Sequence, residues 1–111
     1  MNPSNLGDLL KHATRMRKEI DKVQEDLKNR FVEAHAGGDL VHVTLNGQQE
    51  LVKVSIDPKV FGDGGSKVDL EMLEDLLLAA VSQGIEKSKA LMKEELAKVT
   101  GGLGGMLPGL F

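Results

Sequence analysis

The sequence contains no cysteine, tryptophan or tyrosine, and only three of its 111 residues are phenylalanine. Without cysteine there can be no disulfide, no thiolate zinc site and no cysteine nucleophile. A small chain without a disulfide to stabilise its core is typical of intracellular proteins. Aliphatic side chains and methionine must therefore fill the core, which is modest in a single domain of this length.

The sequence also lacks any apolar run close to the roughly 20 residues that a membrane-spanning helix requires. Its polar N-terminus argues against a secretory signal. The net charge is −3, whereas nucleic-acid-binding domains are usually basic. These absences predict a cytoplasmic protein without a membrane partner.

Two long helical segments flank a short block of β-type sequence. In the first, residues 5–29, apolar residues recur at alternating spacings of three and four, the heptad pattern of a packed helix. These heptad residues are Leu6, Leu9, Ala13, Met16, Ile20, Val23 and Leu27. Asn5 is expected to cap this helix, with Asp8 three residues further on.

Alternation of apolar and polar residues predicts three strands within residues 31–57, with a glycine-containing turn at 37–39. The pair Asn46-Gly47 is a strong hairpin signal. A two-residue turn there would set Val43 against Glu50 on the buried side, so we expect a longer loop that places Val43 opposite Val52 or Val54. Proline at residue 58 ends the third strand because it cannot donate to the ladder.

A flexible connection is expected over residues 59–67, followed by a second helix over 69–99 that begins at Ser66 or Asp69. Its apolar stripe is wide up to Ile85, as in a helix that lies on a sheet. From Glu86 to Lys98 the surface becomes charged, which predicts a projecting arm. Residues 101–111 form a flexible, glycine-rich apolar tail that offers a docking segment for a protein partner; its large side chains include Met106, Leu107, Leu110 and Phe111.

Residues 1–100 are thus predicted to form one α+β domain, an α-β-β-β-α subunit with a three-stranded antiparallel meander and two long projecting helices. A helix of 25 residues spans about 37 Å, whereas a compact chain of this size has a radius of gyration of about 13 Å. The open sheet edges and the over-long heptad stripe are both accommodated by a second copy of the chain. The sequence therefore predicts a homodimer formed through the sheet.

No set of residues predicts catalysis. His35 and His42 are expected to lie opposite each other on the outer face of the sheet, but no further ligand completes a metal site, so a polar cross-strand pair is the favoured interpretation. The glycine-rich residues 62–67 lack the order of a phosphate-binding loop. We expect neither an enzyme, nor a cofactor, nor a small-molecule substrate.

Charge is unevenly distributed along the chain. Residues 5–30 carry seven basic and five acidic side chains, a net charge of +2. Four of the basic residues follow a spacing of four, three and four, which forms one row opposite the heptad residues; they are Lys11, Arg15, Lys18 and Lys22. Two interpretations stay open: a solvated face paired with Glu19, Asp21 and Asp26, or a surface that contacts phosphates.

Three runs of sequence resemble the YbaB/EbfC family of bacterial nucleoid-associated proteins. They are Leu-Val-His-Val-Thr-Leu-Asn-Gly at 40–47, Val-Ser-Ile-Asp-Pro at 54–58 and Leu-Glu-Met-Leu-Glu-Asp-Leu at 70–76. The methionine- and leucine-containing first helix and the glycine-rich tail extend the resemblance over nearly the whole chain.

This resemblance implies a homodimer that binds double-stranded DNA with little sequence preference and is located on the nucleoid, where it acts in nucleoid organisation or gene regulation. Helical arms carry the DNA contact in this family. By position, that selects Lys11, Arg15, Lys18 and Lys22, with Lys87, Lys89 and Lys93 as a second set. His42 replaces a lysine common in the family, and the chain is acidic, so binding is expected to fall steeply with salt. The alternative is a coiled-coil adaptor that binds a protein through its arms and tail.

Overall fold

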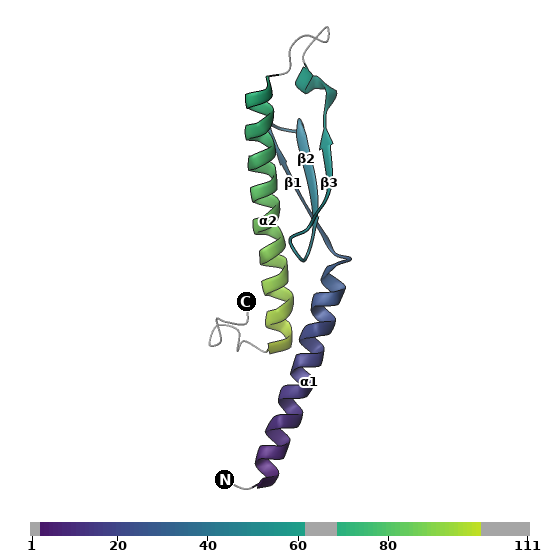
Figure 1. Ribbon diagram of the computed structural model, residues 1–111, viewed down its shortest axis with the longest axis vertical. Helices are drawn as coiled ribbons and strands as arrows, with labels where there is room; N and C mark the ends of the chain where they lie inside the picture. The colour runs from purple at the N-terminus through teal and green to yellow at the C-terminus, as the bar shows by residue number, and fades with distance from the viewer. Residues whose placement is uncertain (1–2, 62–68, 101–111) are drawn as a thin grey trace.

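The computed structural model describes residues 3–61 and 69–100, with side chains from residue 6 onward; the predictions for Ser66, for residues 62–67 and for the tail 101–111 lie outside this part. The chain runs through a helix, three strands and a second long helix, the α-β-β-β-α order predicted from the sequence (Figure 1). The elements are α1 (Pro3–Leu27), β1 (Phe31–Ala36), β2 (Val41–Asn46), β3 (Leu51–Ile56), the short 3-10 helix η1 (Pro58–Phe61) and α2 (Leu70–Thr100).

The three strands form an antiparallel meander with β2 in the centre. The turn between β1 and β2 contains Gly37 and Gly38, both at positive φ, where most side chains would be strained. Between β2 and β3 the chain makes a longer loop than a two-residue turn, and Val43 lies opposite Val54. This is one of the two pairings that the apolar alternation predicts.

The core lies between α2 and one face of the sheet (Figure 1). α2 is capped by Asp69, whose Oδ1 accepts a hydrogen bond from the backbone N of Met72 at 3.0 Å. The buried core side chains are Ala34, Val41, Val43, Leu45 and Ala80. Gly84 of α2 lies against Leu45, and a Cβ atom at this position would collide with that side chain. The glycine thus lets the helix approach the sheet closely.

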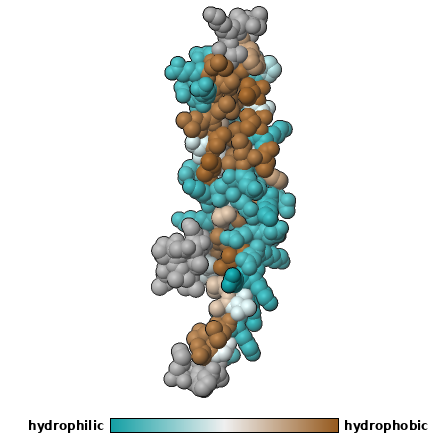
Figure 2. Space-filling model, in the orientation of Figure 1, coloured by the Kyte–Doolittle hydropathy of each residue, from teal (hydrophilic) through white to brown (hydrophobic). Residues whose placement is uncertain are grey.

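The helix-facing side of β3 is not covered by α2, which packs on β1 and β2. Val54 points to the helix side because it lies opposite the buried Val43, yet it is 43% exposed. Val52 and Ile56 at alternate positions are also exposed, and Leu78 of α2 is 69% exposed. We call Val52, Val54 and Ile56 the open apolar face. Figure 2 shows hydrophobic residues gathered over the half of the molecule that contains the sheet and the start of α2. Such a gathering is typical of an interaction surface.

α1 extends far beyond the sheet and gives the molecule dimensions of 78 × 23 × 16 Å. The second half of α2 also passes the end of the sheet and packs against the second half of α1 (Figure 1). The heptad residues of α1 are covered only in that region: Leu27 is buried, and Ile20 and Val23 are half-buried, whereas Leu6 and Leu9 are exposed. We call α1 the arm, and its last turn the root of the arm.

Two predictions about local structure are wrong. α1 begins at Pro3, so Asn5 lies inside the helix and does not cap it; proline is favoured in the first turn because its missing N–H needs no partner there. After β3, Pro58–Phe61 form η1 within the segment for which the sequence predicts a flexible connection. The Oδ1 atom of Asp57 stabilises this turn by accepting a hydrogen bond from the backbone N of Lys59 at 2.9 Å.

Candidate nucleic-acid interface

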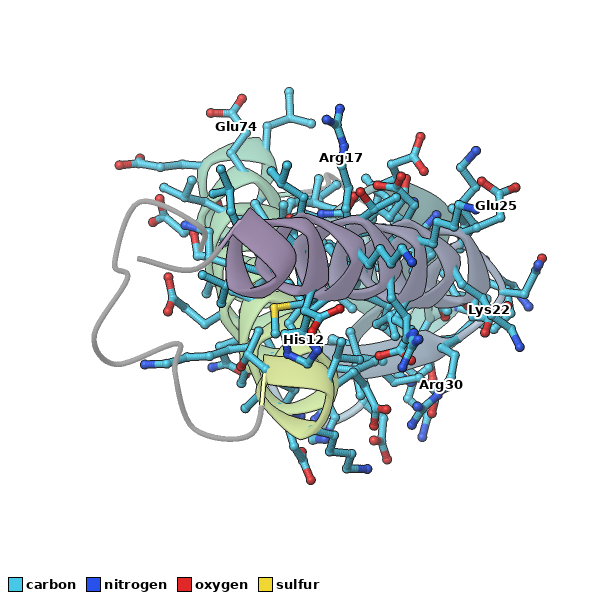
Figure 3. The ribbon with its side chains drawn as sticks, turned by 90° about the horizontal axis from the view of Figure 1, so that it is seen from below. His12, Arg17, Lys22, Glu25, Arg30 and Glu74 are labelled. Atoms are coloured by element: carbon cyan, nitrogen blue, oxygen red, sulfur yellow. The ribbon has the colours of Figure 1, made fainter. Side chains whose placement is uncertain are left out.

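Four basic side chains form one row along the arm, on the face opposite the heptad residues. We call this set the basic row; its members are Lys11, Arg15, Lys18 and Lys22. All four are exposed. In the view along α1, His12 lies on the side toward the end of α2, whereas Lys22 projects outward (Figure 3). The structure therefore brings the predicted set together on a surface that the rest of the described chain leaves free.

The basic row makes no ion pair among residues 6–61 and 69–100. The solvated-face interpretation expects pairs with the three nearby acidic residues of α1, and none of these pairs forms in that part of the chain. The lysine and arginine side chains that do form ion pairs there are Lys28, Arg30 and Lys98. The row is thus available to an external anion, whereas Lys28, Arg30 and Lys98 already have acidic partners.

An open hollow runs along the arm beside the basic row, lined by Leu10, Lys11, Thr14, Arg15 and Lys18. The hydroxyl of Thr14 donates a hydrogen bond to the backbone O of Leu10 at 2.9 Å, which leaves its oxygen free to accept another. Neither Leu10 nor Thr14 was expected at this surface from the sequence. Thr14 follows Lys11 by three residues and precedes Lys18 by four, and this one-face spacing is the signal that identifies it.

A cluster of paired charged side chains lies at the root of the arm. Arg30 Nη1 lies 3.1 Å from Glu95 Oε1, and Lys98 Nζ also lies 3.1 Å from this oxygen. Hydrogen bonds from Lys98 and then Arg30 lower the pKa of Glu95 below its ordinary value. The Arg30–Glu95 pair therefore joins α2 to the residue before β1, whereas Lys98 pairs within α2, and neither cation is part of the basic row.

The three α2 lysines predicted as a second set differ in their surroundings. Lys87 Nζ donates a hydrogen bond to the backbone O of Glu33 at 2.9 Å, so it is engaged with β1. Lys89 and Lys93 are exposed one turn apart and line a separate hollow with Met92 and a residue of the β2–β3 loop. This hollow shares no residue with the one on the arm.

The histidine pair on the outer face of the sheet has the predicted register, with His35 opposite His42. Their rings are stacked with centroids 6.3 Å apart, and His35 Nδ1 lies 3.1 Å from the backbone O of Gly38. Glu33 approaches His42 Nε2 at 3.8 Å. Within residues 3–61 and 69–100 there is no group of three or more histidine, aspartate or glutamate residues that could hold a metal ion.

Comparison with known proteins places the chain in a family. The sequence model of the YbaB/EbfC DNA-binding family matches residues 1–103. The chain belongs to this family. It is 45% identical over 107 residues to a nucleoid-associated protein of Thermoanaerobacter pseudethanolicus, an alignment that covers 96% of this chain and 91% of that protein. A nucleoid-associated protein of Acetivibrio thermocellus is 42% identical over 107 residues, which covers 96% of this chain and 90% of the relative.

A protein of known structure has the same fold. The crystal structure of an uncharacterized protein from Helicobacter pylori matches with a TM-score of 0.66 and 30% identity, over 85% of this chain and 91% of that chain. The resemblance inferred from residues 40–47, 54–58 and 70–76 is therefore confirmed. The family is described by DNA binding and not by a reaction, and no helix among the residues that the structure describes has the length and apolarity needed to span a membrane.

Proposed function

We propose that this protein binds double-stranded DNA as a homodimer on the nucleoid, through contacts between the basic row and backbone phosphates, and acts there in nucleoid organisation or gene regulation. The observation that carries the proposal is the basic row itself. It consists of four exposed cations, unpaired within the described residues, on the projecting helix of a protein from a DNA-binding family. Phosphate contacts supply most of the affinity in binding that does not depend on sequence.

The length and chemistry of the row fit a duplex backbone. From Lys11 to Lys22 the helix rises by about 16 Å, so the four side chains can reach several phosphates in succession. α1 contains no phenylalanine, tyrosine or tryptophan, and the stacking that holds single strands on aromatic side chains is therefore not available from the arm. The arm is thus better suited to phosphates of a duplex than to unpaired bases.

The acidic balance of the whole chain sets the expected strength of binding. The net charge is −3. Acidic residues outside the arm therefore repel DNA unless they face away from it. Because each phosphate contact releases counterions, affinity falls as salt rises. Binding is therefore expected to be measurable at low salt and weak at high salt.

Homodimer formation is supported by the open apolar face. β3 presents Val54 and Ile56 on the helix side, where neither helix of the described residues covers them, and a long apolar edge strand left exposed is an aggregation hazard. A second copy related by a two-fold axis covers the same patch on both subunits. The α1 arms of both subunits would then project from one dimer, and one duplex would meet two basic rows.

The direct test is a mobility-shift titration of duplex DNA at low salt. We expect Lys11→Glu combined with Lys18→Glu to weaken binding by at least about tenfold, because each reversal replaces an attraction to phosphate by a repulsion. Lys53→Glu combined with Lys59→Glu is the matched control, since these exposed lysines lie on β3 and η1 and the net charge is the same. Equal weakening by both double variants, or no binding by the unmodified protein, would contradict phosphate contact by the arm.

A second candidate function is a coiled-coil adaptor that binds a protein partner. The observation that favours it is the uncovered start of the heptad stripe, where Leu6 is 51% and Leu9 is 56% exposed. The apolar segment 101–111 is the other candidate contact. Removing residues 101–111 discriminates between the functions in a pull-down and a DNA titration run side by side: DNA binding should survive the truncation, whereas a partner held by the tail should be lost.

A further inference from the structure

We infer that the β2–β3 loop, residues 47–50, is a clamp that sets the direction of the α1 arm. It would thereby control how the basic row meets DNA, although the loop carries none of the row's cations; this consequence rests on the proposed function. The loop lies where three elements meet: the root of the arm, the sheet and the middle of α2 (Figure 1).

The loop holds the root of the arm by two hydrogen bonds. The backbone N of Gly47 donates to the backbone O of Leu27 at 2.8 Å, and Nε2 of Gln48 donates to the backbone O of Gln24 at 2.6 Å. Both acceptors lie in the last turn of α1, whose carbonyl groups have no partner within the helix. The loop therefore acts as the C-terminal cap of the arm from a distant part of the chain.

The contact is also tight in shape. A Cβ atom placed on Gly47 would lie 2.7 Å from Cδ2 of Leu27 and 2.9 Å from its carbonyl O. The second of these atoms belongs to the helix backbone, so it can move away only if the root of the arm moves. Leu27 itself is 1% exposed. Only glycine at residue 47 thus allows the arm to lie at its present angle.

The same loop is fixed on its other side to α2 and to itself. Oγ of the buried Ser88 donates to the backbone O of Asn46 at 2.6 Å and accepts from the backbone N of Gln49 at 2.9 Å. Oδ1 of Asn46 accepts from the backbone N of Gln48 at 2.9 Å and of Glu50 at 3.1 Å. These bonds hold the loop as one rigid piece. The loop therefore fixes the position of the root of the arm relative to α2.

A small rotation at the root is amplified along the arm. Lys11 lies 16 residues before the root, so a rotation of about 10° there displaces it by about 4 Å, given a rise of 1.5 Å per residue. That displacement exceeds the tolerance of a hydrogen bond between a cation and a phosphate oxygen. Gly47 and Gln48 are thus positioning residues for the basic row.

The experiment measures the angle of the arm and DNA binding separately. The chain has no cysteine, so spin labels can be placed on Asp8→Cys in the arm and Ser55→Cys on the outer face of the sheet. Dilution with unlabelled protein isolates the distance within one chain. We compare Gly47→Ala with Gly7→Ala, a matched control in α1 whose added Cβ meets nothing within 4 Å. Gln48→Ala, which removes one hydrogen bond without adding an atom, is the milder second variant.

We expect Gly47→Ala to shift the distance distribution by several ångströms and Gln48→Ala to broaden it, with circular dichroism unchanged and duplex binding weakened by roughly tenfold in the first variant. Gly7→Ala should leave both measurements unchanged. Distance distributions of Gly47→Ala and Gln48→Ala identical to that of Gly7→Ala would overturn the inference. A shifted distance with unaltered DNA affinity would overturn its functional half. If the unmodified protein binds no DNA, the proposed function fails, while the distances still decide whether the loop orients the arm.

Discussion

Gly84 and Leu45 mark a close approach of α2 to the sheet, and a larger residue at 84 requires the buried side chain of Leu45 or the helix to move. We predict that Gly84→Ala destabilises the protein by about 1–3 kcal/mol, because overpacking of the core outweighs the better helix propensity of alanine. Urea denaturation followed by circular dichroism measures this. Gly7→Ala, with open space around its added Cβ, is the matched control and should stabilise slightly. A stabilised Gly84→Ala would contradict the close approach.

Glu95 provides a prediction about pH. Its pKa lies below the ordinary value because Lys98 and Arg30 donate hydrogen bonds to its carboxylate. A lowered pKa in the folded state means that the contribution to stability is present above the unfolded pKa and is lost as pH falls through the folded pKa. We predict that Lys98→Ala raises the pKa of Glu95 toward its ordinary value, and that Arg30→Ala raises it less. NMR titration of the Glu95 carboxyl carbon tests this, and an unmoved pKa in Lys98→Ala would exclude the proposed cause.

Residue contacts close to a turn could be predicted, whereas contacts between distant elements could not. Apolar alternation and loop length predict the pairing of His35 with His42, and they give Val54 as one of two predicted partners of Val43. The bond from Lys87 to the backbone of Glu33 joins residues 54 apart in sequence. No local pattern encodes that contact, because it depends on how α2 docks on the sheet.

At the scale of the element, one heptad stripe contains leucines in two different environments. Leu27 at the root of the arm is 1% exposed, whereas Leu9 is 56% exposed. We predict that Leu27→Ala lowers the free energy of unfolding by about 2–5 kcal/mol, because it leaves a cavity, and that Leu9→Ala changes it by less than about 0.5 kcal/mol. Chemical denaturation of the two variants makes the comparison. A large loss for Leu9→Ala would indicate that the start of the arm is covered in solution.

The heptad pattern predicted a helix correctly but could not say what covers it. Periodicity reports which face of a helix is apolar and not which neighbour it meets. The charged stretch from Glu86 to Lys98 predicted an arm, and α2 does pass the end of the sheet. Its buried Ser88 and Leu96 nevertheless pack there, against the β2–β3 loop and α1. These two uncharged residues lie within a charged stretch of sequence. The average charge of the stretch therefore conceals the contacts that they make.

At the scale of the molecule, the open apolar face leads to a prediction about assembly. We predict that Val54→Asp converts a dimer to a monomer, because a charge buried between two copies is costly. Light scattering coupled to gel filtration at micromolar concentration measures the mass. Lys53→Asp is the matched control, since this neighbouring residue lies opposite Thr44 and therefore on the other face of β3. A monomeric unmodified protein, or equal effects of the two variants, would argue against a dimer through this face.

Net charge argued against a nucleic-acid partner, because it averages over surfaces that point in different directions. The chain has a net charge of −3, but residues 5–30 have a net charge of +2. Within the described residues the acidic partners that could neutralise the basic row do not pair with it. Helical spacing showed where the row lies, whereas its freedom from ion pairs became visible only with the side chains in place.

The most direct test of phosphate contact by the arm is the salt dependence of duplex binding, measured by fluorescence anisotropy. If all four cations of each of two subunits contact phosphates, the logarithm of the binding constant should fall against the logarithm of salt concentration with a slope of up to about −7. Lys11→Gln combined with Lys18→Gln removes two of these contacts from each subunit. The account predicts a slope shallower by about 3 to 4 in this variant, and an unchanged slope would contradict it.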